Sequence, residues 1–388
     1  MSPLSFLLLT LLTGVLSQCT DFSCCSLNGV YMPGLGLCTC DSPWTGANCT
    51  LLDLLPAHSP VQGYGMAPNE TTWGGNVVFF EAQYHLFVAE MVLDCPLSDW
   101  TTNSQCIHAT SSSPVGPFVK QDVSIGVWCH NPQVVMFNES GGAASFALFH
   151  IGDSSAFGAG KHVRNCTANA SSTTPAAAAL LPDGDPPHIR STANSSTIQL
   201  SNSPGGPWQP VSPGPPACNN PAPLLHPNGT WFLVCASIKL YSAPALAGPW
   251  TFVLTLPTGG APGSQLEDAF LFLDPRGNWH ILFHAFSRGG EDALTCANST
   301  VAAHMFSADG LLWKMSPTPP FGNEVAWSDG STMRVATRER PKLIFSESGV
   351  PTHLVNGVCG GLSACAPTPC VNCKYYAWDF TLIQPLQL

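Results

Sequence analysis

Residues 199–208 read QLSNSPGGPW, and three other parts of the chain repeat this motif. Residues 108–118 read HATSSSPVGPF, residues 240–250 read LYSAPALAGPW and, more loosely, residues 305–313 read MFSADGLLW. Each copy contains an apolar stretch that ends at Ser, a tight turn with Pro or Gly, and an aromatic residue that opens the next stretch. Four copies of one hairpin indicate a repeat architecture made of β-strands.

A second repeated motif, a polar step before an apolar run, completes the unit. Two copies are closely alike, CHNPQVV at 129–135 and CNNPAPLL at 218–225, and a further apolar strand follows most copies. The unit is therefore a four-stranded antiparallel blade, and five units predict a five-bladed β-propeller. A β-sandwich is the alternative all-β fold. The polar steps lie at residues 75–76, 130–131, 219–220, 267–268 and 339–340.

The composition and the N-terminus narrow the class of protein. Only 10% of the residues are charged and the net charge is −11, so we expect no nucleic-acid partner. Residues 6–16 form an apolar run that is too short to cross a bilayer and is typical of a signal peptide, which we place at residues 1–17. We therefore predict a secreted, extracellular protein with no membrane span.

Cysteines and glycosylation sequons indicate the same compartment. All 17 cysteines follow the predicted signal peptide, and their odd number leaves one thiol free or bonded between chains. Residues 152–195 are rich in Ala, Ser, Thr and Pro, and we predict a flexible glycosylated insertion there. Eight N-x-[ST] sequons predict glycosylation at Asn48, Asn69, Asn138, Asn165, Asn169, Asn194, Asn228 and Asn298.

A small cysteine-rich module at residues 18–50 precedes the propeller, which we place at residues 60–388. The module is too short to bury a sufficient core and needs covalent cross-links. Its end, CTCDSPWTGANC at 38–49, resembles the close of an EGF-like module, although Tyr31 stands where such a module has its third cysteine. The pairing stays open. We predict disulfides among Cys19, Cys24, Cys25, Cys38, Cys40 and Cys49.

The polar steps should ring one mouth of the propeller channel, because the innermost strand of each blade begins there. Successive strand residues face opposite ways, so one of two rows faces the channel and the other packs between blades. One row is Gly75, His130, Asn219, Glu267 and Glu339, and the other is Asn76, Asn131, Asn220, Asp268 and Arg340.

These features resemble the five-bladed propeller glycosidases, the arabinanase, xylosidase and invertase superfamily, over about residues 70–385. The step at Asp268 is similar to the D-P step of that superfamily, and the step at Glu339 is similar to its E-G-P step. The resemblance implies hydrolysis of glycosidic bonds in carbohydrate. It also places acids in the first three blades, where this chain has Asn, which cannot exchange protons.

Glycoside hydrolysis usually needs two carboxyl groups. On the inner rows we expect Glu267 or Asp268 to be the acid. Glu339 would be the base or nucleophile, because pairing with Arg338 or Arg340 would lower its pKa. We predict a glycoside hydrolase-like protein that cleaves at the channel mouth. The alternatives are an inactive glycan-binding propeller, and an adhesion or signalling protein that binds an extracellular protein through the EGF-like module.

Other residues near the mouth are candidates to bind an oligosaccharide or polysaccharide. The asparagines bind sugar hydroxyls or cap strands, and Arg338 and Arg340 bind substrate or form a structural ion-pair network. His284 lines the channel, binds a metal or is structural, and Trp73 stacks on a sugar or packs in the core. We expect no metal and no cofactor. The predicted substrate-binding residues are Asn76, His130, Asn131, Asn219, Asn220, Arg338, Arg340, Trp73 and His284.

Overall fold

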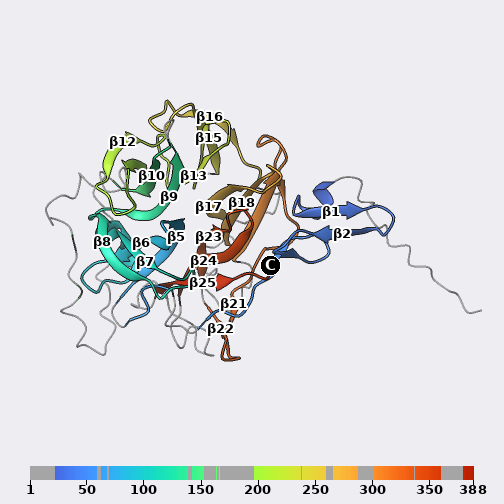
Figure 1. Cartoon of the computed structure of the whole chain (residues 1–388), viewed down its shortest axis with the longest axis horizontal. Coiled ribbons are helices and arrows are strands. Elements are labelled where there is room, and N and C mark those ends of the chain that lie inside the picture. Colours follow the sequence, from blue (N-terminus) through green and yellow to red (C-terminus); the bar gives the residue numbers. More distant parts are fainter. Residues whose placement is uncertain are drawn as a thin grey trace, which may run out of the picture.

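The computed structural model confirms the predicted all-β, five-bladed propeller with a small disulfide-rich N-terminal unit (Figure 1). Five antiparallel sheets surround a common axis, four of them with four strands and the last with three. The predicted insertion at 152–195 lies almost wholly outside the described residues. The structure describes residues 22–58, 63–67, 70–138, 142–152, 163, 166, 196–236, 238–258, 265–286, 301–335, 337–359 and 379–388.

Blades 1 to 3 follow one another along the chain, each numbered from its innermost strand. Blade 1 comprises β5 (Thr72–Phe80), β6 (Gln83–Met91), β7 (Ser104–Ser111) and β8 (Val119–Ile125). Blade 2 comprises β9 (His130–Asn138), β10 (Ala144–Ile151), β11 (Ser196–Ser201) and β12 (Gln209–Pro213). Blade 3 comprises β13 (Ala222–Leu225), β14 (Trp231–Cys235), β15 (Lys239–Ala243) and β16 (Thr251–Thr255).

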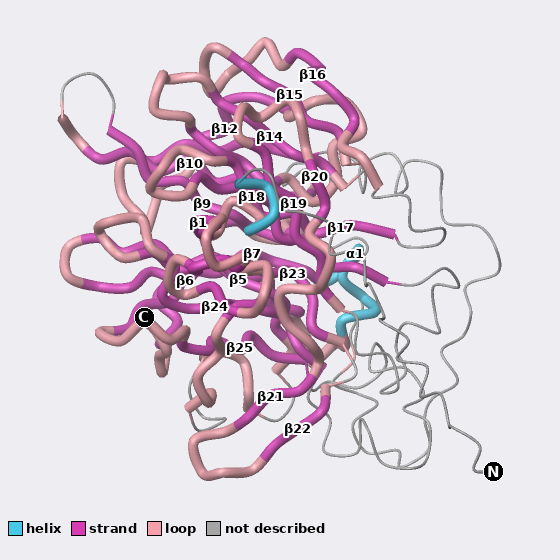
Figure 2. The backbone as a smooth tube through the Cα atoms, turned by 90° about the vertical axis from the view of Figure 1, so that its right-hand side faces the viewer, coloured by secondary structure: helices cyan, strands magenta, loops and turns pink. Residues whose placement is uncertain are grey.

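Blades 4 and 5 complete the ring. Blade 4 comprises β17 (Gln265–Leu273), β18 (Trp279–Phe286), β19 (Ala302–Ser307) and β20 (Lys314–Met315). Blade 5 comprises β23 (Arg338–Phe345), β24 (Pro351–Cys359) and β25 (Asp379–Pro385). In Figure 2 a hairpin of β21 (Glu324–Ala326) and β22 (Thr332–Arg334) extends below the blades.

The elements outside the blades are short. They are η1 (Phe22–Cys25), β1 (Gly29–Met32), β2 (Leu37–Cys40), β3 (Trp44–Thr45), β4 (Leu51–Leu52), η2 (Leu97–Asp99) and α1 (Trp100–Asn103). Within the described residues, no helix is long and apolar enough to cross a membrane.

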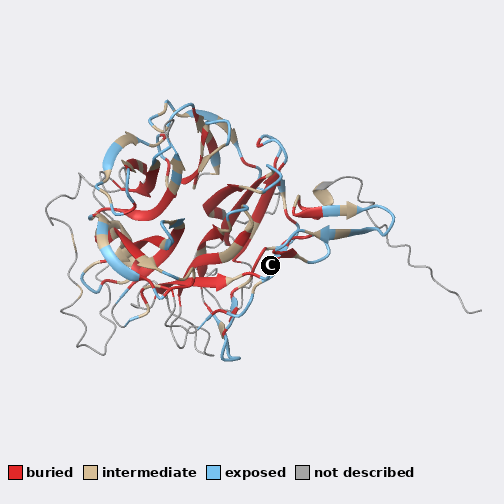
Figure 3. Ribbon diagram, viewed as in Figure 1, coloured by how far each residue is buried: buried red, intermediate tan, exposed pale blue. Residues whose placement is uncertain are grey.

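The repeated Ser-turn-aromatic motif connects the third and fourth strands of blades 1 to 4, as expected from its turn chemistry. The core lies between neighbouring blades: Phe87 of blade 1 packs with Phe146 and Leu148 of blade 2, and all three are fully buried. Burying a large apolar side chain stabilises a fold by about 1.5–3 kcal/mol. Figure 3 shows these buried inner strands and the exposed outer strand β8. Such packing holds the inner strands rigidly around the axis.

A β-bulge near the start of the inner strands decides which residues reach the axis. In β17 the register shifts between Glu267 and Phe270, so two residues of β17 lie opposite one residue of β18, and β5, β9 and β23 show the same shift. The first residue of the bulge has a positive φ in these four blades, and so does Asn220, which lies just before β13 in blade 3. These angles are 63° at Gly74, 52° at Asn131, 48° at Asn220, 54° at Asp268 and 53° at Arg340.

The bulge corrects our alignment of blade 1 by two residues. We aligned Asn76 with Asn131, but the strand register and the positive φ put Gly74 at that position. A side chain has no room there, because a Cβ atom on Gly74 would lie 2.9 Å from the Cβ atom of Arg340. Blade 1 therefore brings no polar side chain to this level of the axis.

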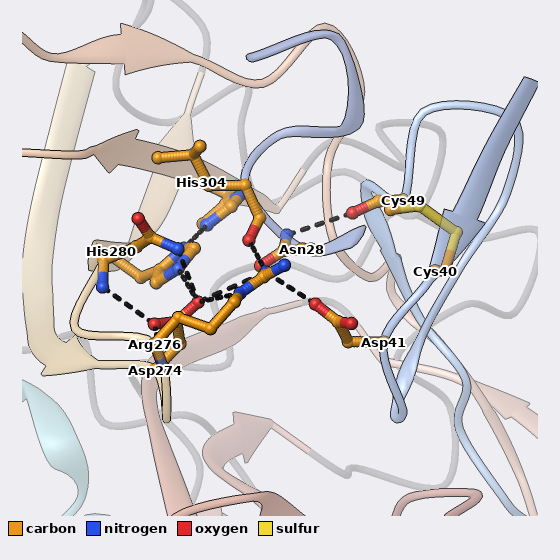
Figure 4. A network of polar contacts seen from close by, with 10 residues as sticks. Asn28, Cys40, Asp41, Cys49, Asp274, Arg276, His280 and His304 are labelled. Carbon is orange, nitrogen blue, oxygen red and sulfur yellow. Dashed lines mark hydrogen bonds and ion pairs between the residues drawn. A yellow bond between two sulfur atoms is a disulfide. The ribbon is translucent and has the colours of Figure 1, made fainter. Parts of the chain in front are cut away.

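The N-terminal unit contains the Cys25–Cys38 and Cys40–Cys49 disulfides and lies against blade 4. In Figure 4, Arg276 of the β17–β18 turn reaches Asp41, with 2.5 Å between Nη2 and Oδ2. The ring of Trp44 lies 4.9 Å from that of His304. The bulge at the predicted channel mouth lies near the start of β17, and Arg276 follows the end of this strand. The N-terminal unit therefore contacts the end of blade 4 that is opposite to the predicted mouth.

Candidate active site

Three carboxyl groups from blades 4 and 5 gather around one imidazole. We call Glu267, Asp268, His284 and Glu339 the carboxylate–histidine cluster. The His284 Nδ1 atom lies 3.6 Å from Glu267 Oε1 and 4.0 Å from Asp268 Oδ2, and its Nε2 atom lies 3.9 Å from Glu339 Oε1. One ligand atom from each of the four residues lies within 4.8 Å of the other three.

Local structure explains this convergence. Glu267 of β17 pairs in register with His284 of β18, so the two side chains are neighbours across the ladder. The positive φ of Asp268 turns its carboxylate into the protein, where its side chain is 0% exposed. Glu339 occupies the same pre-bulge position in β23 as Glu267 in β17. Its side chain is 13% exposed and that of Glu267 is 37% exposed, so these two carboxylates are the ones that a ligand can reach.

Arg340 fills the axis beside the cluster. Its Nη1 atom lies 3.0 Å from Asp268 Oδ1 and donates a hydrogen bond of 3.1 Å to Asn220 Oδ1. Its Nη2 atom donates to His130 Nε2 over 3.3 Å. The guanidinium of blade 5 is thus held by side chains from blades 2, 3 and 4, while Gly74 of blade 1 leaves room for its stem.

His130 is neutral and its tautomer is defined by its partners. Burial, reinforced by the nearby Arg340 charge, lowers its pKa well below the ordinary value. Because Nε2 accepts from Arg340, Nδ1 carries the proton and donates to Ser104 Oγ over 2.7 Å, and Ser104 donates to the carbonyl of Cys129 over 2.7 Å. Asn131 Nδ2 donates to Asn220 Oδ1 over 3.1 Å. This neutral scaffold positions Arg340.

The pKa of Asp268 is raised to about 6. Burial of the carboxyl is the largest cause; Arg340 opposes the shift, and the charges of Glu267 and Glu339 reinforce it. The Arg340 contact is close but is not aligned as a hydrogen bond, and among the described residues no group donates one to either oxygen of Asp268. Burial also disfavours the charged form of His284, but the surrounding carboxylates outweigh it and raise the pKa of His284.

Lys342 is a buried cation near the cluster that we did not predict from the sequence. Its Nζ atom donates to the carbonyl of Ala269, in the bulge beside Asp268, over 3.3 Å. Burial lowers its pKa to about 7, Asp268 opposes this shift and Arg340 adds to it. The available sequence signal was a lone lysine in the apolar run PKLIF after the polar step at Arg340.

Arg338 does not contact the cluster. Its guanidinium donates to Asn356 Oδ1 over 2.9 Å and Gln384 Oε1 over 2.8 Å, and it lies 4.8 Å from the ring centroid of Phe321. Burial lowers its pKa to about 9. Arg340 pairs with Asp268, so neither arginine forms the ion pair with Glu339 that we expected. The bulge separates the two arginines, because it sends Arg340 to the axis and leaves Arg338 between blades.

Three more predicted residues have structural partners. Trp73 is 2% exposed and packs in an apolar cluster with Met91, so it lies in the core and not at a sugar-binding surface. Asn76 Oδ1 accepts a hydrogen bond of 2.8 Å from the backbone of Val134, which joins blades 1 and 2. Asn219 is half-buried, and its Oδ1 accepts from the amide of Asn220 over 3.1 Å.

The cluster also has the donor atoms of a cation site, with three carboxylates and one imidazole. Its negative charge is already balanced in part by Arg340, 3.0 Å from Asp268, and by the imidazole, whose pKa is raised. We therefore assign no metal to it. A second group, around Asp99, contains the Cys95–Cys166 disulfide and offers no thiolate.

No protein-family model matches the sequence, and no curated protein matches it. Solved structures match in fold. A thermostable family-43 glycoside hydrolase is 12% identical, with 86% of this chain and 93% of that chain covered and a TM-score of 0.51. The catalytic domain of a GH62 α-L-arabinofuranosidase from Coprinopsis cinerea is 11% identical, with 86% and 97% covered and a TM-score of 0.52. The chain therefore has the five-bladed propeller fold of these glycoside hydrolases, as its motifs implied.

Proposed function

We propose that the protein is carbohydrate-active and cleaves glycosidic bonds by acid–base catalysis at the channel mouth. The observation that carries this proposal is the convergence of three carboxyl groups from two adjacent blades around His284, within 4.8 Å of one another. Glycoside hydrolysis uses such a pair of carboxyl groups, one protonated and one ionised. The fold shared with two glycoside hydrolases supports a carbohydrate as the substrate class.

The exposed fractions of the three carboxyl side chains indicate which of them acts as the acid and which as the base or nucleophile. Glu267, the more exposed carboxyl, donates a proton to the glycosidic oxygen, which leaves with the electron pair of the broken C–O bond. Glu339 attacks the anomeric carbon or removes a proton from an attacking water. Asp268 is too buried to reach the sugar, and its raised pKa keeps a proton within the cluster up to about pH 6. If Glu339 acts as the base, His284, which lies between the two glutamates, can return that proton to Glu267. If Glu339 attacks the anomeric carbon, Glu267 regains its proton from the water that hydrolyses the glycosyl-enzyme.

The predicted sugar-binding residues contribute in two ways. His130 and Asn220 form hydrogen bonds with Arg340, and Asn131 donates one to Asn220, so we propose that these residues position the charges of the site. Asn219 is half-buried beside them and remains the better candidate for a direct hydrogen bond to a sugar hydroxyl.

Turnover of a panel of aryl glycosides and polysaccharides tests the proposal. Glu267→Gln and Glu339→Gln should each lower kcat/KM by about 10²–10⁴-fold, the range for loss of an acid or base. Glu324→Gln is the matched control, since its side chain is 62% exposed and lies in the β21–β22 hairpin, which is outside the five blades. Full activity in both cluster variants would refute the assignment.

A propeller that binds glycans without turnover is the second candidate. It is favoured by the axial positions of the first three blades, which hold Gly74, Asn131 and Asn220 and cannot exchange protons. Binding of an oligosaccharide with no turnover, unaffected by Glu339→Gln, would support this candidate over the enzyme.

We also propose a signal peptide at 1–17, an EGF-like module at 18–50 and a propeller at 60–388 in a secreted glycoprotein. Every cysteine in the described residues is disulfide-bonded, which favours an oxidising compartment. The sequon residues Asn48, Asn138 and Asn228 are exposed, as glycan attachment requires. Mass spectrometry of the secreted chain before and after removal of N-glycans would test the cleavage point and the sites. Capture of an extracellular protein by the module would test the adhesion alternative.

A further inference from the structure

We propose that a cavity on the flank of blade 1 is a second saccharide-binding site, separate from the carboxylate–histidine cluster. The cavity has a volume of about 930 Å³. It lies among the end of β6, the start of β8 and the segment 63–67, which bridges to β25 of blade 5 through Tyr64 and Thr381. Its size falls within the roughly 300–1,000 Å³ of small-molecule sites, and it shares no lining residue with the cluster.

A polar network forms one side of this cavity. Glu90 accepts hydrogen bonds from Tyr64 Oη over 3.0 Å, from Gln105 Nε2 over 2.7 Å and from Lys120 Nζ over 2.5 Å. The Glu90 side chain is only 15% exposed, whereas that of Lys120 is 39% exposed. An ammonium has three donors, and an amide has two donors and an acceptor, so the network keeps hydrogen-bonding capacity for ligand hydroxyls.

Apolar side chains also line the cavity, and two of them are exposed. Val119 is 62% exposed and Leu93 is 45% exposed, and both line the cavity with Met66 and Phe118. Exposed apolar surface beside a polar network indicates a binding site. A pyranose ring has both an apolar C–H face and a rim of hydroxyl groups, which can contact the apolar side chains and the polar network respectively. The cavity therefore fits a saccharide better than a purely apolar ligand.

The charges select an uncharged saccharide. Among the described residues that line the cavity, Lys120 is the one cation and is already paired with Glu90, while the acids Glu70 and Asp94 also line it. An anionic sugar would meet net negative charge there. Two sources can supply a neutral saccharide: a free oligosaccharide, or this chain's own N-linked glycan, because the predicted sequon at Asn69 directly precedes Glu70.

Binding to the full chain carrying Asn69→Gln tests the site, because this variant removes the neighbouring glycan. The probes are N,N′-diacetylchitobiose, which matches the core of an N-linked glycan, and xylotetraose, observed by saturation-transfer NMR and calorimetry. Val119→Glu should weaken binding at least tenfold. Val123→Glu is the matched control, since Val123 is 45% exposed on the same strand but does not line the cavity. Lys120→Met and Lys239→Met form a second pair of test variant and control, because Lys120 lines the cavity and Lys239 does not.

The outcomes separate the sources. If the chitobiose binds Asn69→Gln but not the glycosylated chain, the natural occupant is the chain's own glycan. If either probe binds both forms equally, the occupant is a free oligosaccharide. The proposal is overturned if neither probe binds Asn69→Gln, or if the Val119 and Val123 variants lose affinity equally. Repeating the titration with Glu339→Gln shows that the result does not depend on catalysis.

Discussion

Replacing Arg340 with Met should destabilise the protein in a pH-dependent way. Arg340 is 10% exposed, and its guanidinium lies 3.0 Å from the fully buried Asp268. Removing one partner of such a buried pair typically costs about 3–5 kcal/mol in the free energy of unfolding. At pH 7 the variant leaves a buried carboxylate without its cation, so we expect a loss of this size.

The sign of the pH dependence follows from Asp268. Its pKa in the folded protein, about 6, already lies above the ordinary value of 3.8, and loss of Arg340 should raise it further. A carboxyl with a raised pKa destabilises the folded state increasingly as pH rises from the unfolded pKa to the folded pKa. Well below pH 6 Asp268 is protonated in the folded state of both wild type and variant, so its ionisation no longer contributes to the difference between them. At pH 4 only the lost hydrogen bonds to Asn220 and His130 remain, worth about 1–2 kcal/mol.

Urea unfolding of wild type and Arg340→Met at pH 4, 5, 6 and 7 measures this difference. Arg334→Met is the control, because its contact with Glu324 is 3.7 Å long and both side chains are more than half exposed. Such a surface pair contributes about 0–1 kcal/mol. The double variant Arg340→Met with Asp268→Asn should recover part of the stability at pH 7. An equal loss at pH 4 and pH 7 would refute the coupling of Arg340 to Asp268.

Three further predictions concern the axis. Gly74→Ala should lower the free energy of unfolding by more than Gly229→Ala in a urea melt, because both have positive φ, 63° and 88°, but only Gly74 has Arg340 within 2.9 Å of the added Cβ atom; equal losses would contradict this. The kcat/KM should fall as pH rises above about 6, where Asp268 loses its proton, and a flat profile between pH 5 and 8 would contradict this. One oxygen of each cluster carboxylate lies within 4.8 Å of the others, which leaves little room for the water that inverting glycosidases hold between their carboxyl groups, so NMR should detect retention of the anomeric configuration.

The fold could be predicted from the sequence because short local motifs mark each blade. The Ser-turn-aromatic hairpins and the polar steps depend on residues close together in the chain, and each marks one blade. Our alignment of blade 1 was wrong because this blade has no polar residue at the position where the other four blades have one, just before the apolar run of the innermost strand. At Gly74 the positive φ is adopted by glycine, so nothing polar labels the position that Asn131 and Asn220 occupy in their blades.

The site was only partly predictable because the bulge breaks the alternation of strand residues. Alternation alone puts Arg338 and Arg340 on the same face of β23. The bulge that begins at Arg340 changes this: the Arg340 side chain lies at the axis, whereas the Arg338 side chain lies in the core. The contact of His284 with Glu267 depends on the register of β17 with β18. Lys342 is recognisable only once its neighbours in blade 4 are known.

The arrangement of charges explains why acids can be confined to two blades. Arg340 would strongly lower the pKa of a neighbouring carboxyl if its guanidinium donated its hydrogen bonds to that carboxyl alone. Here its hydrogen bonds go to Asn220 and to a neutral His130, and its contact with Asp268 is not aligned as one. Burial therefore dominates, and the pKa of Asp268 stays raised despite a guanidinium at 3.0 Å. Amides and a neutral imidazole in blades 2 and 3 thus serve the carboxyl groups of blades 4 and 5: they hold the central cation in place while leaving a proton available beside Glu267.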